Sequence, residues 1–208
     1  MPLPDILILA VLVVGAYLAG SVPSGLLLIR RFASIDLRTF GSGNIGATNA
    51  KRAGGWPLGL ATLFLDILKG ALPTGLAVLL FGRTGIPAQA GICLVAIGAF
   101  AGHLHPVYLG FKTGGKGVAT AAGCFIILSH YAFLAALGMF IAATATTQRV
   151  SAGSLAAAAI LPPAVYVLEG PVLATGALVI SILILVRHRE NIRRLLSGTE
   201  PKLTDKHR

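Results

Sequence analysis

Three short polar stretches, rich in glycine or in basic side chains, interrupt a chain that is otherwise strongly apolar. They lie at residues 41–52, 110–120 and 187–200. Glycine lets backbone N–H groups approach a ligand closely, while lysine and arginine add full positive charge. This combination is typical of sites that bind phosphate. The stretches therefore predict a site that binds anions, and the apolar segments of the chain must hold its residues in place.

The second stretch has the clearest pattern, since Gly114, Gly115 and Gly117 surround Lys116 and a helix is expected from about Val118. Loop N–H groups, the positive end of the helix dipole and the lysine together would bind a phosphate. The stretch is not a nucleotide-binding P-loop, because Gly117 stands where Ser or Thr must bind magnesium. We therefore expect no nucleotide, no metal and no other cofactor. A glycine loop that serves only as a tight turn is the alternative.

The first stretch combines glycines with neutral hydrogen-bonding side chains. Its candidate substrate-binding residues are Gly43, Asn44, Thr48 and Asn49. Arg52 has a planar guanidinium that suits phosphate oxygens, and Ser42 carries a hydroxyl that could serve the reaction or cap a helix. We interpret the neighbouring Lys51 as an ordinary charge of a cytoplasmic loop.

In the third stretch His188 and Asn191 have the i, i+3 spacing near a helix end, which places them on one side of the helix. On residue type alone, such a histidine is as readily a solvated side chain. Glu200 follows in a short tail, and Ser151 is a further polar residue in a different loop. Residue type alone does not assign a role to these four residues, so they are candidate site residues that longer sequence motifs have to support.

Asp66 and Lys69 stand inside an apolar run with the same i, i+3 spacing. Unpaired charge is costly in lipid, so we expect a structural role in which they pair with each other or with the backbone. Contact between Lys69 and a substrate is the alternative. His103 and His105 do not predict a metal site, because alternate helix residues do not share a face and no carboxylate adjoins them in the sequence.

The amino-acid composition indicates that the segments between these stretches lie in a membrane. Hydrophobic residues make up 55% of the 208 residues, charged residues 12%, and the mean hydropathy is +0.84. A soluble domain carries about twice that charged fraction. Because more than half of the residues are apolar, the chain is not a soluble basic protein, and its net charge of +10 does not indicate nucleic-acid binding. We expect an all-α polytopic membrane protein that lies in the lipid bilayer as a single domain over residues 1–208.

Six apolar stretches are candidates for crossing the bilayer. They are residues 3–29, 56–81, 87–109, 118–147, 155–168 and 172–186. Basic residues favour the cytoplasmic side, and this rule is satisfied only if 118–147 is a pair of helices, one to about Leu128 and one from about Tyr131. Seven transmembrane helices result, with the N-terminus outside and the C-terminus in the cytoplasm. All basic residues except Lys69 and Arg83 then face the cytoplasm.

Four sequence runs, in order and spread over nearly the whole chain, resemble one known family. They are G-S-G-N-I-G-A-T-N from Gly41, D-x-x-K-G from Asp66, G-G-K-G-V-A-T from Gly114 and N-I-x-R-L-x-x-G-T-E from Asn191. Together they resemble the bacterial acyl-phosphate-dependent glycerol-3-phosphate acyltransferases, the PlsY family of integral membrane enzymes.

The resemblance implies transfer of a fatty acyl group from acyl phosphate to the 1-hydroxyl of sn-glycerol 3-phosphate, which yields lysophosphatidic acid and phosphate. It implies catalytic roles for Ser42, Arg52, Lys116, His188 and Asn191. Ser151 is expected to contact substrate, and Glu200 is expected to be structural and to pair with a basic residue. The motif loops, at about 38–54, 110–120 and 187–200, would face the cytoplasm from the bacterial inner membrane. No obligatory protein partner is expected.

The residue inventory fits direct acyl transfer. Other glycerolipid acyltransferases use a histidine with an aspartate five residues later, and no histidine of this chain has one. Because a phosphate leaving group activates the acyl carbonyl, positioning and charge stabilisation suffice, and we expect no acyl-enzyme. One alternative is a transporter of a phosphorylated metabolite, which needs polar residues through the membrane midplane. The other is an alcohol phosphotransferase, whose metal ions need more aspartates.

Overall fold

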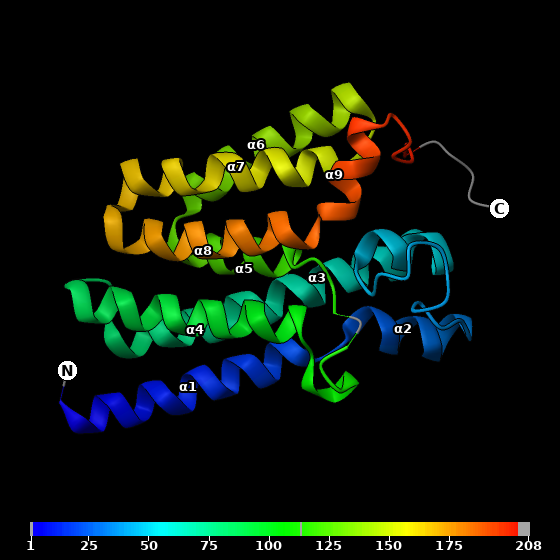
Figure 1. Ribbon diagram of the computed structural model, residues 1–208. Helices are drawn as coiled ribbons and strands as arrows, with labels where there is room; N and C mark the ends of the chain where they lie inside the picture. Colours follow the sequence, from blue (N-terminus) through cyan, green and yellow to red (C-terminus); the bar gives the residue numbers. More distant parts are fainter. Residues whose placement is uncertain (1, 113, 204–208) are drawn as a thin grey trace. The chain divides into compact units, whose positions relative to one another are not determined.

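The computed structural model describes residues 2–112 and 114–203, which form helices and loops without a β-strand (Figure 1). The helices in chain order are α1 (Leu3–Ser21), α2 (Ser24–Ala33), α3 (Ala47–Phe81), α4 (Ile86–Leu104), the short 3₁₀ helix η1 (Val107–Leu109), α5 (Val118–Leu128), α6 (His130–Thr147), α7 (Val150–Glu169), α8 (Pro171–Arg187) and α9 (Arg189–Leu196). The expected all-α fold is confirmed for these residues. Thr113 of the second polar stretch and the basic residues Lys206 and Arg208, expected in the cytoplasm, lie outside them.

The chain divides into two compact units. The N-terminal unit, Met1–Ile127, holds α1 to α4, η1 and all but the last residue of α5; the C-terminal unit, Leu128–Arg208, holds α6 to α9. In the N-terminal unit α1, α2 and α4 all pack on α3, and α1 also packs on α4. In the C-terminal unit α7 packs on both α6 and α8. Each unit therefore has its own helix-on-helix core.

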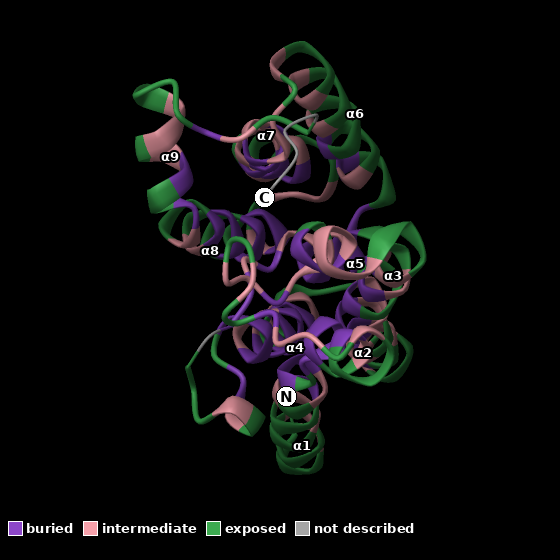
Figure 2. Cartoon of the chain, turned by 90° about the vertical axis from the view of Figure 1, so that its right-hand side faces the viewer, coloured by how far each residue is buried: buried purple, intermediate pink, exposed green. Residues whose placement is uncertain are grey.

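Close packing of α1 on α4 organises the N-terminal unit. Here α4 is more enclosed than α1, which is exposed along most of its length (Figure 2). A Cβ at Gly20 would overlap the carbonyl oxygen of Ala99, and one at Gly102 would overlap that of Tyr17. Small residues at helix contacts are typical of membrane proteins, because lipid tails leave van der Waals packing as the main attraction between helices.

The first apolar stretch, expected to continue to residue 29, is broken at Val22 and Pro23. Proline lacks the N–H group that a continuing helix needs, so one helix ends before it and another starts after it. The second helix, α2, is amphipathic: it buries Leu26 and Ile29 and carries its basic residues in the last turn. The chain therefore leaves the first span through a short helix with a polar face.

The long apolar run at 118–147 is divided as the charge pattern predicts, because α5 ends at Leu128 and α6 begins at His130. Five helical stretches are long and apolar enough to cross a membrane. They are Leu3–Ala33, Ala47–Phe81, Ile86–Leu109, His130–Thr147 and Val150–Glu169. A sixth results if α8 and α9, which are bent by 61°, are taken together, and α5 is apolar but shorter. The described residues thus provide five or six candidate spans.

Candidate active site

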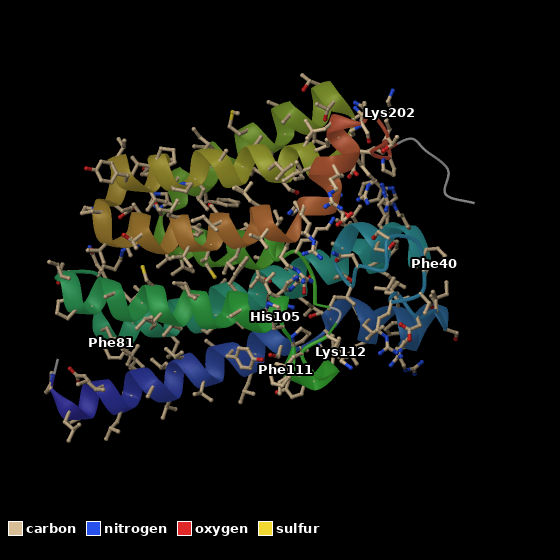
Figure 3. All side chains as sticks on the ribbon, in the orientation of Figure 1. Phe40, Phe81, His105, Phe111, Lys112 and Lys202 are labelled. Carbon is tan, nitrogen blue, oxygen red and sulfur yellow. The ribbon has the colours of Figure 1, made fainter. Side chains whose placement is uncertain are left out.

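Polar atoms gather near the motif loops in each unit (Figure 3). In the N-terminal unit they surround α2, the start of α3 and the loop after α4, where His105, Phe111 and Lys112 are labelled. In the C-terminal unit they lie around α9 and the segment that leads to Lys202. Each unit therefore builds its own local network from its own motif.

The side chain of Asn49, on the first turn of α3, holds the loop that precedes this helix. Asn49 is 1% exposed. Its Nδ2 donates to the carbonyl oxygens of Leu37 at 3.3 Å, Phe40 at 2.9 Å and Asn44 at 2.9 Å. Its Oδ1 accepts from the N–H of Ser42 at 3.3 Å. The amide is thus fully engaged with its own loop, which does not fit the expected substrate contact.

The other polar residues of this loop lie nearer the surface. Ser42 and Thr48 are exposed, and Asn44 is half-buried and accepts a 2.8 Å hydrogen bond from the N–H of Gly46 at its Oδ1. Gly43 has φ +68°, a left-handed conformation that favours glycine. The N-cap of α3 is Gly46, so Ser42 is not a helix cap and its hydroxyl is presented from the loop.

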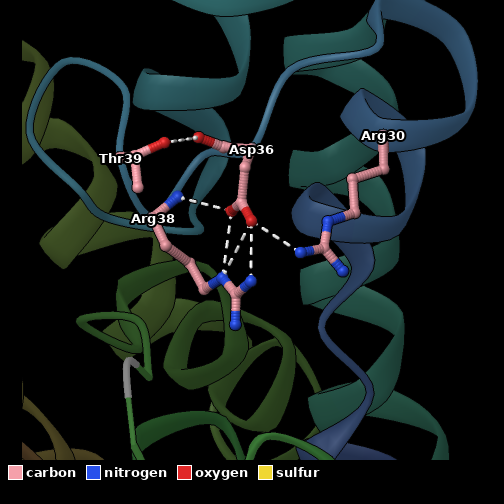
Figure 4. A network of polar contacts seen from close by, with 4 residues as sticks. All are labelled: Arg30, Asp36, Arg38 and Thr39. Atoms are coloured by element: carbon pink, nitrogen blue, oxygen red, sulfur yellow. Dashed lines mark hydrogen bonds and ion pairs between the residues drawn. The ribbon is translucent and has the colours of Figure 1, made fainter.

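Asp36 ties α2 to the same loop and was not among the expected residues (Figure 4). Its carboxylate accepts from Arg38 Nη2 at 2.6 Å and from Arg30 Nη2 at 2.5 Å, and its carbonyl accepts from the Thr39 hydroxyl at 3.2 Å. Hydrogen bonds from Arg38 above all, and from Arg30, hold the pKa of the Asp36 carboxyl well below its usual range. Two of the basic residues near the motif therefore share one carboxylate, which offsets one of their two positive charges.

The sequence does carry a signal for this cluster. Asp36 is the only acidic residue between Asp5 and Asp66, and it stands among basic residues. A lone acid in such a setting is expected to pair with its neighbours.

Lys51 and Arg52 lie on the first turns of α3, ahead of a break in the helix at Gly55, where φ is +78°. The Lys51 ammonium lies over the ring of Trp56, 3.6 Å from its centroid, as in a cation–π pair. Trp56 itself is exposed. Lys51, interpreted above as an ordinary cytoplasmic charge, thus also joins the two sides of the break. Arg52, the adjacent candidate, is half-buried.

The glycines of the second motif dock their loop onto the C-terminal end of α4. A Cβ at Gly114 would overlap the carbonyl oxygen of Leu104, and Gly117, with φ +82°, faces the ring of Phe100. The N–H of Gly115 donates to the carbonyl oxygen of His103 at 3.1 Å. The expected helix start at Val118 is confirmed. The N–H of Gly115 is used within the protein, so the expected phosphate cradle has to rely on other groups.

Lys116 is half-buried between these docked glycines. The backbone is therefore fixed on both sides of Lys116, and the loop presents the lysine side chain from this fixed position.

Asp66 and Lys69 form a buried ion pair on α3, with 2.9 Å between Oδ1 and Nζ. Lys69 Nζ also donates at 3.1 Å to the carbonyl oxygen of Val22, which lies at the break of α1 before proline and also accepts from the N–H of Ser24. His103 Nδ1 lies 3.9 Å from the Asp66 carboxylate, a neighbour that its sequence position did not indicate. This geometry favours the structural interpretation of the pair over substrate contact by Lys69.

In the C-terminal unit His188 stands at the bend between α8 and α9 and is 2% exposed. Its Nδ1 lies 2.8 Å from the carbonyl oxygen of Ile184. A carbonyl oxygen only accepts, so Nδ1 carries a proton and Nε2 is the acceptor of the neutral ring. The buried ring is therefore held in one orientation, which differs from the solvated side chain considered above.

Glu200 joins α7 to α9. Its Oε1 accepts from the Ser151 hydroxyl at 2.6 Å and from Asn191 Nδ2 at 2.7 Å, and its Oε2 accepts from Arg194 Nε at 2.7 Å. Arg149 Nε donates to the Glu200 carbonyl oxygen at 2.9 Å. Burial by itself raises the pKa of the Glu200 carboxyl, but the hydrogen bonds from Ser151, Arg194 and Asn191 outweigh it, so this pKa lies below its ordinary value.

The candidate residues therefore differ in exposure. Asn49, Ser151, Asn191 and Glu200 are buried and bonded to other parts of the protein. Asn44, Arg52 and Lys116 are half-buried, and Ser42 and Thr48 are exposed. Within residues 2–112 and 114–203, no three His, Cys, Asp or Glu side chains are grouped so that they could hold a metal ion.

Comparison with known proteins gives one consistent relationship. The sequence model of the family described as glycerol-3-phosphate acyltransferase matches residues 10–198. Proteins named glycerol-3-phosphate acyltransferase are similar to the chain: one from Geobacter sulfurreducens is 48% identical over 89% of this chain and 92% of its own length. Another, from Anaeromyxobacter dehalogenans strain 2CP-C, is 49% identical over 96% of this chain and 99% of its own length.

Two crystal structures of PlsY (YgiH), an integral membrane glycerol 3-phosphate acyltransferase, are also similar. The glycerol 3-phosphate form has a TM-score of 0.87 and 38% identity, covering 94% of this chain and 95% of that one. The lysophosphatidic acid form has a TM-score of 0.85 and 36% identity, covering 93% of this chain and 94% of that one.

Proposed function

The chain belongs to the glycerol-3-phosphate acyltransferase family, and we propose that a fatty acyl phosphate is its donor. It is a membrane acyltransferase that acts on glycerol 3-phosphate. Lysophosphatidic acid is then the product, and inorganic phosphate is released. The observation that carries this proposal is the match over residues 10–198, together with the similarity to a relative whose structures are named for glycerol 3-phosphate and lysophosphatidic acid.

The acyl group passes directly between the substrates. The 1-hydroxyl oxygen of glycerol 3-phosphate attacks the acyl carbonyl carbon, and the bond between this carbon and the phosphate oxygen breaks. Phosphate leaves with the bonding electrons, and an oxygen of a substrate phosphate takes the hydroxyl proton. Because phosphate is a good leaving group here, positioning and charge stabilisation carry the reaction without an acyl-enzyme.

Five residues take part in this reaction. Arg52 and Lys116 stabilise the charge of the departing phosphate, since both are cations on motif loops. His188 and Asn191 orient glycerol 3-phosphate, and the His188 Nε2 is the ring nitrogen that accepts a hydrogen bond from a hydroxyl. Ser42 contacts substrate with its exposed hydroxyl and stays unacylated. Gly43, Asn44 and Thr48 remain candidates for substrate contact.

Other motif residues hold these groups in place. Asn49 fixes the loop that carries Ser42, and Glu200 fixes Asn191 through a 2.7 Å hydrogen bond. Ser151 donates to the same carboxylate, so we assign it a supporting role in place of substrate contact.

The proposed topology has seven spans, with the N-terminus outside and the C-terminus and motif loops in the cytoplasm of an inner membrane. The five long stretches, the bent pair of α8 and α9, and the short α5 supply the seven. Arg83, just beyond α3, donates from Nη1 to the carbonyl oxygen of Ile127 in α5 at 3.0 Å, which supports a common side for the C-terminal ends of these helices. A single acyltransferase domain over residues 1–208 is part of the proposal, and the match of one family model over residues 10–198 supports it.

A donor-competition assay tests the proposed donor. The purified protein receives labelled glycerol 3-phosphate and, in separate reactions, acyl phosphate, acyl-CoA or acyl carrier protein thioester, all with a metal chelator. We expect labelled lysophosphatidic acid from acyl phosphate. Product from the thioesters alone, or a strict need for magnesium, would contradict the proposal.

Two variants of the same loop test the role of charge. Lys116→Ala is expected to lower turnover by about a hundredfold to a thousandfold, because a group that stabilises the leaving phosphate is lost. Lys112→Ala removes an exposed lysine of the same loop and serves as the matched control. Full turnover by folded Lys116→Ala protein would refute the charge role, and an acyl group trapped on Ser42 would refute direct transfer.

A further inference from the structure

His103 is a buried histidine that the proposed reaction does not use. It lies one position before the end of α4, is 3% exposed, and contacts both a charged pair and the second motif. Its Nδ1 faces the carboxylate of Asp66 at 3.9 Å. Asp66 is in turn bonded to Lys69, which binds the carbonyl oxygen at the break of α1. One side of the imidazole therefore lies close to the charged pair on α3.

The other side of the ring meets the glycine loop. A Cβ at Gly115 would overlap Nε2 of His103 and lie 2.7 Å from its Cε1. The imidazole therefore occupies the volume that any side chain at position 115 would need. The N–H of Gly115 also donates to the His103 carbonyl oxygen at 3.1 Å, so this one residue holds Gly115 through its ring and through its backbone.

Gly115 has an ordinary φ, unlike Gly117 at +82°. Backbone conformation therefore does not require glycine at position 115, whereas the ring of His103 does. Lys116 follows directly, and its Cα position depends on where Gly115 is held. A shift of about 1 Å in a charged group at a reacting centre can reduce the rate by about a hundredfold.

We propose that His103 is a positioning residue for the acyl transfer: it links the Asp66–Lys69 pair to Gly115 and thereby fixes Lys116 against the phosphate that this lysine binds. The inference rests on the proposed role of Lys116. Its distinctive consequence is that glycine at 115 is required by a histidine of the protein rather than by the substrate.

Four variants test this inference by steady-state kinetics for both substrates, expressed per folded molecule, with the melting temperature as the measure of stability. His103→Ala is expected to lower kcat/KM by about tenfold to a hundredfold and to raise the KM of the substrate whose phosphate Lys116 contacts. His103→Gln, whose amide reaches the position of Nε2, is expected to retain most of the activity.

Gly115→Ala is expected to lose activity, because its methyl group would overlap the ring of His103. The double variant His103→Ala with Gly115→Ala is expected to regain part of this activity, because the methyl group enters the volume that the ring has left. His105→Ala is the matched control, since His105 is exposed and close in sequence.

A merely structural role would lower the melting temperature and the folded fraction but leave kcat and both KM values of the folded molecules unchanged, and that result would overturn the inference. The inference would also be overturned if the double variant were no more active than Gly115→Ala. In that case the substrate, and not His103, would be what excludes a side chain at position 115. If His103→Ala does not fold, His103→Gln and the two Gly115 variants decide in the same way. The assay uses whichever donor the wild type accepts, so failure of acyl phosphate as donor would refute the proposed function and leave this comparison valid.

Discussion

A single carboxylate, that of Glu200, receives hydrogen bonds from side chains on α7 and α9. Its pKa is lower in the folded protein than the ordinary value of 4.5. A group with a depressed folded-state pKa stabilises the fold fully above its unfolded pKa, and this contribution is lost as the pH falls through the folded pKa. The stabilisation by Glu200 is therefore complete near neutral pH, and it is lost only as the pH falls below 4.5 and through the lower pKa of the folded protein.

Glu200→Gln is expected to lower stability near pH 7 by about 1–3 kcal/mol, because charged hydrogen bonds to Ser151, Asn191 and Arg194 are lost. The difference from the wild type should shrink as the pH falls below 4.5 and through the lower pKa of Glu200 in the folded protein. Thermal unfolding of the detergent-solubilised protein across this pH range measures it. Glu190→Gln is the control, since Glu190 pairs at 3.6 Å with exposed arginines and such pairs contribute little. A difference between Glu200→Gln and wild type that does not change with pH would contradict the linkage.

The amide of Asn49 offers a second test, because its Nδ2 faces three carbonyl oxygens. Asn49→Asp keeps the shape but removes the donor, so it should destabilise the protein by about 1–3 kcal/mol. Asn44→Asp is the matched substitution: the Asn44 Oδ1 is an acceptor for the Gly46 N–H, and a carboxylate preserves this bond. Equal melting temperatures for the two variants would show that Asn49 does not hold the loop.

Residue type and spacing indicated the motif residues as candidates, but they could not show what each side chain contacts. An asparagine in a polar loop has the same appearance in the sequence whether its amide faces a substrate or its own backbone, and only the fold distinguishes Asn49 from Asn44. The same holds for Ser151, whose hydroxyl turns to Glu200. The partners of Asp66 include His103, far away in the chain, which no local pattern indicates.

Among the helices, α3 and α5 cross at two glycines. A Cβ at Gly70 would overlap the carbonyl oxygen of Thr120, and one at Gly123 would overlap that of Ile67. This contact holds the short helix that follows the second motif against the longest helix of the described chain. The two helices therefore lie closer at these glycines than a side chain at either position would allow.

Gly70→Ala is therefore expected to destabilise the protein by about 1–3 kcal/mol, because the added methyl forces the two helices apart. Gly75→Ala on the same helix is the control: its Cβ would lie 3.9 Å from the nearest atom, so the gain in helix propensity should leave stability equal or higher. Thermal unfolding of both variants measures the contrast. Equal losses would indicate that the glycines act through flexibility instead of contact.

The limit between α5 and α6 followed from the sequence because the pattern of basic residues marks it. The division of the run at 118–147 was predicted because basic residues would otherwise lie on the wrong side of the membrane. The break at Pro23 was missed because the run from residue 3 to 29 is apolar on both sides of the proline. Hydropathy alone cannot show where a carbonyl such as that of Val22 finds its partner in another helix.

At the scale of the whole molecule, the composition placed the chain in a membrane, and its charges predict how it is oriented. The division into an N-terminal and a C-terminal unit was not predicted, because it depends on which helices pack together and not on how apolar each is. The proposed orientation therefore needs a direct measurement.

Single cysteines report this orientation. In a protein lacking Cys93 and Cys124, which are buried, a cysteine at Thr84 should react with a membrane-impermeant maleimide in spheroplasts. Cysteines at Lys112 or Ser197 should react only after the membrane is opened, because these exposed positions lie in the proposed cytoplasmic segments. Labelling of Ser197→Cys from outside would overturn the position of the C-terminus.

The stacking of Lys51 on Trp56 equips the protein with an optical reporter. The chain has a single tryptophan, so all indole fluorescence arises beside the helix break that Arg52 precedes. The emission of an indole depends on a cation held 3.6 Å above its ring, and the ring is exposed enough for quenchers to reach. A movement of the first turns of α3 when a phosphate arrives would therefore be visible as a spectral change in the unlabelled enzyme, on the timescale of a single turnover.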